Sequence, residues 1–133
     1  MAEKILAVDD DPDILDALTL ILESKGYEVV GARNGLEALD RLREEQPDLM
    51  ILDLLMPKMD GFEVYKMLRQ PEWSKFKGMP ILILTSVRED ASRRRYELET
   101  SEKLEVDDYL EKPFLPEVLL ERVGKIIKKK QNL

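Results

Sequence analysis

Two stretches of the chain, LMILDLL (residues 49–55) and PILILTS (residues 80–86), are apolar at almost every position. A strand with one face in water alternates apolar and polar side chains, whereas a parallel strand covered on both faces is apolar nearly throughout. Both stretches therefore predict central strands of a parallel sheet. Parallel neighbours need a long crossover between them, commonly a helix, so the rest of the chain must supply helices for both faces.

The remaining sequence supplies these elements in strict alternation. Three further segments read as strands: KILAV (residues 4–8), YEVVGA (27–32) and DDYL (107–110). Apolar residues at helical spacing mark the first and last helices, namely Ile14, Leu15, Leu18, Ile21 and Leu22 ahead of Gly26, and Leu119, Val123, Ile126 and Ile127. Capping-box spacing begins two helices, at Asn34 with Glu37 (running to about Glu45) and at Asp60 with Glu63. A charged helix is expected over EDASRRRYELETSEKL (89–104). Five strand–helix units predict one doubly wound α/β domain with right-handed crossovers.

Composition restricts the chemistry open to this domain. The 133 residues include no cysteine and no histidine, so disulfides, thiolate metal sites and the commonest general base are excluded. The net charge of −7 argues against nucleic-acid binding. No stretch approaches the ~20 apolar residues of a membrane span, and MAEKILAVDDD turns acidic too early for a signal peptide. We expect a cytoplasmic protein without membrane contact.

Three consecutive aspartates, Asp9, Asp10 and Asp11, follow the first strand. Asp11 precedes Pro12 at the start of a helix, so it is expected to be an N-cap. Ligands of open parallel sheets bind beyond the carboxyl ends of the strands, where Asp53 closes the third strand. If the first and third strands are neighbours, Asp9, Asp10 and Asp53 converge there. A solvated turn remains the alternative for the acidic run, but a carboxylate ending an apolar strand favours a hard cation such as Mg²⁺.

Lys112 and Thr85 end two other strands at the same predicted edge. A lysine ammonium is a compact charge suited to a phosphoryl oxygen, and a threonine hydroxyl can donate to a second oxygen. Each residue alone is unremarkable, since loop lysines are usually solvated and threonine is common in strands. Their joint placement with the aspartates favours a phosphoryl site.

The motifs ILAVDDDPDIL, PDLMILDLLMPKMDGFEV, PILILTS and DDYLEKPF, in this order, resemble the receiver domains of bacterial two-component response regulators, the CheY-like superfamily. The likeness covers about residues 3–128 of a domain expected to span 1–133. It implies a flavodoxin-like (βα)5 fold, with strand order 2-1-3-4-5, that accepts a phosphoryl group. The resemblance makes this a signalling phosphoacceptor rather than an enzyme, promoting only its own phosphorylation and dephosphorylation.

The resemblance also assigns roles to individual residues. Asp53 matches the phosphoacceptor, and Asp9, Asp10, Asp53 and the backbone carbonyl of Leu55 match the ligands of Mg²⁺ or Mn²⁺. Thr85 matches the family's active-site hydroxyl residue, and Lys112 matches its active-site lysine. Thr85 and Tyr109 together match the family's switch pair. The Lys112–Pro113 peptide is a candidate cis bond.

The implied donor is a sensor histidine kinase or a histidine phosphotransfer protein, because this chain has no histidine of its own to carry the phosphoryl group. The implied output surface comprises the fourth helix, fifth strand and fifth helix, in a monomer or a phosphorylation-dependent dimer, and its effector is unknown. The stretches 68–80 and 85–112 are longer than usual, which puts the output surface in doubt. The run Arg93–Arg95 is either a solvated helix face or a docking site for an acidic partner. A degenerate, binding-only receiver and an aspartate-nucleophile phosphatase or phosphotransferase remain as alternatives.

Overall fold

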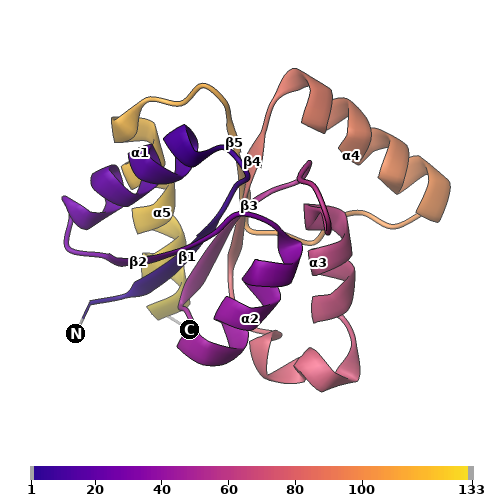
Figure 1. The fold of residues 1–133 in the computed structure, drawn as a ribbon, viewed down its shortest axis with the longest axis horizontal. Coiled ribbons are helices and arrows are strands. Elements are labelled where there is room, and N and C mark those ends of the chain that lie inside the picture. The colour runs from indigo at the N-terminus through magenta and orange to yellow at the C-terminus, as the bar shows by residue number, and fades with distance from the viewer. Residues whose placement is uncertain (1, 132–133) are drawn as a thin grey trace.

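A computed structural model describes residues 2–131 of the chain (Figure 1). The five strands form one parallel sheet in the order β2-β1-β3-β4-β5, which confirms the predicted fold class. Their bounds are β1 (Lys4–Val8), β2 (Glu28–Ala32), β3 (Leu49–Asp53), β4 (Ile81–Thr85) and β5 (Asp108–Glu111). Of the expected domain 1–133, Met1 and residues 132–133 lie outside the described residues.

Helices cover both faces of the sheet. They are α1 (Pro12–Glu23), α2 (Gly35–Glu45), α3 (Gly61–Leu68), α4 (Val87–Thr100) and α5 (Pro116–Gln131), with a short 3-10 helix, η1 (Pro71–Phe76), after α3. Residues Leu49 and Ile51 of β3 pack with α1 and α5, whereas Met50 and Leu52 pack with α2 and α3. Every residue of β3 is buried for this reason. Complete burial of one leucine side chain contributes about 1.5–3 kcal/mol, so the two apolar strands anchor the core.

Helix α4 differs from the prediction for residues 89–104. It begins earlier, at Val87, because the Ser86 side chain caps it, and it ends at Thr100, before Ser101 with a left-handed φ of 59°. The predicted last turn is therefore wrong. Leu104 instead lies in the connection between α4 and β5 and is buried in the same core cluster as residues of α2 and α3. Packing of this side chain overrides the helical preference of its neighbours.

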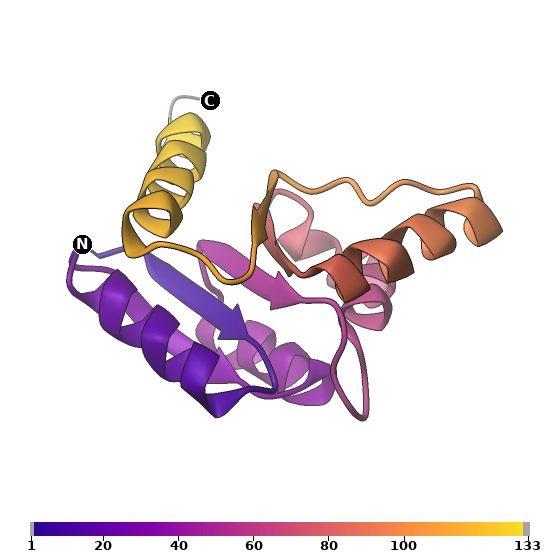
Figure 2. The ribbon, with the colours of Figure 1, turned by 90° about the horizontal axis from the view of Figure 1, so that it is seen from above.

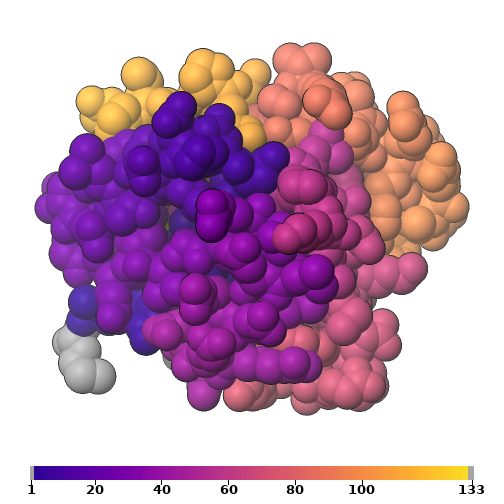
Figure 3. All heavy atoms as spheres, in the orientation of Figure 1, coloured from indigo at the N-terminus to yellow at the C-terminus, as the bar shows by residue number. Residues whose placement is uncertain are grey.

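Much of α4 lies beyond the sheet (Figure 2) and forms the right-hand edge of the molecule (Figure 3). Among the described residues of α4, the one that is buried is a charged residue, Glu89. An aromatic stack between Phe62 of α3 and Tyr96 of α4, with ring centroids 4.8 Å apart, fixes the middle of the helix. The first turn of α4 is thus the part nearest the ends of the strands.

The lengthened segment before β4 contains η1, whose Trp73 and Phe76 side chains are buried. Among residues 2–131, no helix combines the length and apolarity required to cross a membrane.

Candidate functional site

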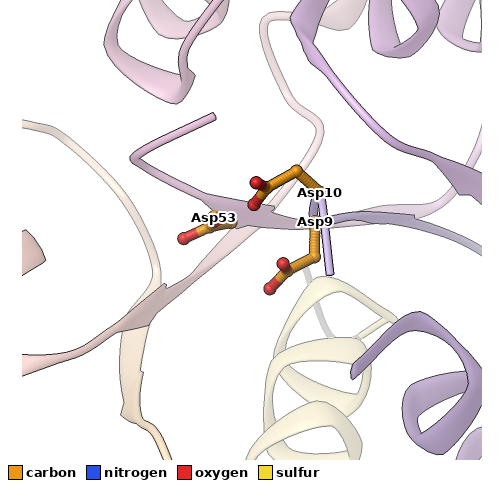
Figure 4. A group of neighbouring side chains, drawn as sticks. All are labelled: Asp9, Asp10 and Asp53. Atoms are coloured by element: carbon orange, nitrogen blue, oxygen red, sulfur yellow. The ribbon is translucent and has the colours of Figure 1, made fainter. Parts of the chain in front are cut away.

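Three aspartates meet at the carboxyl edge of the sheet (Figure 4). Asp9 follows β1, Asp10 is next in the chain, and Asp53 is the last residue of β3. One carboxylate oxygen from each lies within 4.8 Å of the others. Asp9 and Asp53 are each 1% exposed, whereas Asp10 is exposed to solvent. The expected convergence follows from β1 and β3 being hydrogen-bonded neighbours.

The turn between β1 and α1 fixes these carboxylates. Asp9 Oδ1 accepts the Asp11 N–H at 2.9 Å, and Asp11 Oδ1 accepts the Asp13 N–H at 2.9 Å. Asp11 is therefore the N-cap of α1, which confirms that prediction. The second oxygen of Asp9 remains directed to the site.

The loop after β3 is pressed against the strand end. The Gly61 N–H donates to the Leu54 carbonyl at 2.9 Å. A Cβ at Gly61 would lie 2.4 Å from the Asp53 carbonyl oxygen, closer than atoms can approach, so only glycine fits. Leu55, in this loop, lines the same cavity of about 340 Å³ as Asp10 and Arg88.

Lys112 places its ammonium among the buried carboxylates. The backbone N–H of Lys112 donates to the Thr85 carbonyl at 2.7 Å, which holds the end of β5 against β4. Its Nζ lies 3.4 Å from Asp9 Oδ2 and 3.3 Å from Asp53 Oδ1. The Lys112–Pro113 peptide is cis, as the resemblance implied. Burial lowers the pKa of Lys112, but the surrounding carboxylates outweigh it and raise the pKa overall, so this lysine stays charged.

Glu89, which was not predicted to belong to the site, is a fourth carboxylate there. Its Oε1 lies 3.0 Å from Lys112 Nζ, the shortest of the lysine's three ion pairs. The Ser86 hydroxyl donates to the same oxygen at 3.2 Å, and the Glu89 N–H donates to Ser86 Oγ at 3.3 Å. The signal in the sequence was the capping-box spacing of Ser86 and Glu89.

That spacing does not fix the direction of the glutamate. In α3 the Glu63 carboxylate accepts the Asp60 backbone N–H at 3.2 Å, which completes a capping box. Glu89 instead turns to Lys112. The same sequence pattern thus gives a local cap in one helix and a contact with the site in another.

The negative charges exceed the positive charge around Lys112. Burial raises the pKa of Asp53 well above its usual range, and the adjoining Glu89 and Asp9 carboxylates raise it further. Burial also raises the pKa of Asp9. Oxygen ligands with an excess of negative charge suit a hard divalent cation such as Mg²⁺. Asp9, Asp10 and Asp53 are the candidate ligands, together with the Leu55 carbonyl.

The two expected switch residues lie on the neighbouring strands. Thr85 is buried at the end of β4, and its hydroxyl donates to the Ser86 carbonyl at 3.2 Å. Tyr109 is partly buried on β5, with the Arg93 guanidinium 5.1 Å from its ring centroid. Burial raises the pKa of the Tyr109 hydroxyl.

The arginine run is largely occupied within α4. Arg93 pairs with Asp90 at 2.7 Å and with Glu97 at 3.0 Å, and Arg94 pairs with Asp90 at 3.0 Å. These contacts favour the solvated-face interpretation over a docking site.

Known proteins contain a domain similar to this chain. The family model "response regulator receiver domain" matches residues 5–124. The alkaline phosphatase synthesis transcriptional regulatory protein PhoP of Bacillus subtilis is 40% identical over 131 residues, which are 98% of this chain and 51% of PhoP. Response regulator MprA of Mycobacterium bovis is 40% identical over 97% of this chain and 52% of MprA. The chain thus spans about half the length of these curated relatives.

Among solved structures, the chemotaxis protein CheY4 of Vibrio cholerae superposes with a TM-score of 0.79 at 33% identity. The match covers 95% of this chain and 99% of CheY4.

Proposed function

The chain belongs to the response regulator receiver domain family of two-component systems, and from this membership we propose that Asp53 is its phosphoacceptor. The observation that carries the proposal is the position of the Asp53 carboxylate. It is buried at the end of a central strand, within 4.8 Å of two other carboxylates and 3.3 Å from a lysine ammonium. A core aspartate with this surplus of negative charge costs stability and needs a functional reason.

In the proposed reaction, an Asp53 carboxylate oxygen forms a bond to phosphorus. The bond from phosphorus to the donor breaks at the same time, and its electron pair leaves with the imidazole nitrogen of phosphohistidine or with the acetate of acetyl phosphate. Lys112 holds an oxygen of the transferring group as a point charge, and Thr85 donates its hydroxyl to another after turning from the Ser86 carbonyl. Mg²⁺ bound by Asp9, Asp10, Asp53 and the Leu55 carbonyl would neutralise the remaining charge.

The proposed output is a change in the surface formed by α4, β5 and α5. Thr85 ends β4, directly before Ser86, which caps α4, and Tyr109 lies beneath Arg93 of that helix. Movement of Thr85 toward the phosphoryl group would disturb this contact, which gives Tyr109 its role as the second switch residue. The expected effector is a partner that binds this surface.

We place residues 1–133 in a single receiver domain of a cytoplasmic signalling protein. The donor is a sensor histidine kinase or a histidine phosphotransfer protein, since no histidine occurs in the chain. This role involves no reaction on another substrate.

Intact mass spectrometry tests the proposal. With acetyl phosphate and Mg²⁺, the mass should rise by one phosphoryl group, and the rise should vanish in Asp53→Asn or when the metal is chelated. An equal mass gain in Asp53→Asn would refute the assignment. No gain in the wild-type protein with any donor would favour a receiver that only binds partners.

A further inference from the structure

Glu89 forms an ion pair with Lys112, the residue proposed to hold a phosphoryl oxygen. Lys112 Nζ lies closer to Glu89 Oε1, at 3.0 Å, than to Asp9 or Asp53, at 3.4 and 3.3 Å. The ammonium has three donor hydrogens; it donates to Asp9 and Asp53 and forms an ion pair with Glu89. An incoming phosphoryl oxygen must therefore approach an ammonium that already faces three carboxylates.

The Glu89 side chain is held in this position at a cost. Glu89 is 7% exposed, and its second oxygen, Oε2, has no hydrogen-bond donor among the described residues. A buried acceptor without a donor costs about 1–3 kcal/mol. Capping of α4 does not require this arrangement, because Ser86 Oγ already accepts the Glu89 N–H. The ion pair with Lys112 and the hydrogen bond from the Ser86 hydroxyl hold the carboxylate inside.

We propose, on the basis of the proposed phosphorylation of Asp53, that the Glu89 carboxylate is an internal competitor of the phosphoryl group for Lys112 and must leave the site when Asp53 is phosphorylated. Glu89 carries the same negative charge as a phosphoryl oxygen and binds the same donor. Its presence slows phosphorylation by like-charge repulsion. Its departure releases the first turn of α4 from its tie to Lys112.

The first turn of α4 connects this exchange to the proposed output surface. Asp90, the residue after Glu89, holds Arg93 at 2.7 Å, and Arg93 lies over the Tyr109 ring. Displacement of Glu89 therefore shifts the segment that positions Arg93. The competitor would thus couple occupancy of Lys112 to the environment of Tyr109.

The first test compares Glu89→Gln with wild type. Glutamine keeps the length of the side chain and can still accept from Ser86, but it lacks the charge. Glu99→Gln is the matched control, because it removes one charge from an exposed position of the same helix. With acetyl phosphate and Mg²⁺, the initial rate of mass gain should rise about tenfold in Glu89→Gln, which corresponds to about 1.4 kcal/mol. It should stay at the wild-type rate in Glu99→Gln.

A second measurement needs no variant and reads conformation rather than phosphorylation. Amide hydrogen exchange of residues 86–91 in the wild-type protein should speed up after phosphorylation. In Glu89→Gln these amides should exchange fast before phosphorylation and change little after it. Wild-type exchange that is the same with and without the donor would overturn the proposal, even if the variant did not fold.

The outcomes separate this inference from the proposed function. If Asp53 is phosphorylated in the wild type but Glu89→Gln and Glu99→Gln react at equal rates, Glu89 is no competitor while the phosphoacceptor assignment stands. If the wild-type protein gains no phosphoryl group on Asp53, the proposed function itself fails.

Discussion

Asp53→Asn should stabilise the metal-free protein, although it removes an ion pair from the core. At an effective dielectric constant of about 20, the ion pair of Asp53 with Lys112, 3.3 Å apart, contributes about 5 kcal/mol. Repulsion from Asp9, with oxygens no more than 4.8 Å apart, costs at least about 3 kcal/mol on the same scale. Asp10 and Glu89 add further repulsion, and burial disfavours the charge.

These opposing contributions leave a net cost for the charged Asp53 carboxylate. We expect a gain of about 1–2 kcal/mol in the free energy of unfolding, or about 3–8 °C in melting temperature. Thermal unfolding in a chelating buffer measures it. Asp40→Asn, an exposed position in α2, is the control and should leave the melting temperature unchanged.

The pH dependence identifies the cause. Because the pKa of Asp53 is raised in the folded state, the folded protein keeps a proton that the unfolded chain releases as the pH rises above about 4. The contribution of Asp53 to stability therefore falls with rising pH until the folded carboxyl also ionises. The advantage of Asp53→Asn should grow over this range and vanish below pH of about 4. An Asp53→Asn protein that is less stable than wild type at neutral pH would show that the Lys112 ion pair dominates.

Three further predictions concern the metal, the loop after β3 and the phosphoryl lifetime. Asp10→Ala should remove the rise in melting temperature that Mg²⁺ causes in the wild type; an equal rise in both would place the metal elsewhere. Gly61→Ala should lower the free energy of unfolding in urea by about 1–3 kcal/mol, because its Cβ would meet the Asp53 carbonyl at 2.4 Å; unchanged stability would mean that the loop adjusts freely. Leu55→Asn or Val87→Glu should shorten the phosphoryl lifetime after donor removal, since both native side chains are apolar and cannot orient a water; identical decay curves would exclude water access at these positions as the control.

The sheet and the acidic cluster were predictable, because the strands are evident in the sequence and the aspartates lie at the ends of two of them. Apolar runs fix β3 and β4 as central strands, and parallel neighbours bring Asp9 and Asp53 to one edge. The roles assigned to these residues remain predictions. The end of α4 was not predictable, because burial of Leu104 depends on distant parts of the core. Glu89 was missed for a related reason: capping-box spacing places a glutamate in the first turn, but only the tertiary position of Lys112 decides where its carboxylate binds.

The single tryptophan of the chain, Trp73, is well placed as a fluorescent reporter of unfolding. It lies in η1, which precedes β4, whereas the aspartates follow β1 and β3 at the opposite ends of the strands. A strand of five residues separates these two ends by about 16 Å. The indole packs against Phe76, with Arg43 4.3 Å from its ring centroid. Its emission should therefore follow loss of the core while staying constant during metal titrations, so one cuvette experiment can separate unfolding from events among the carboxylates.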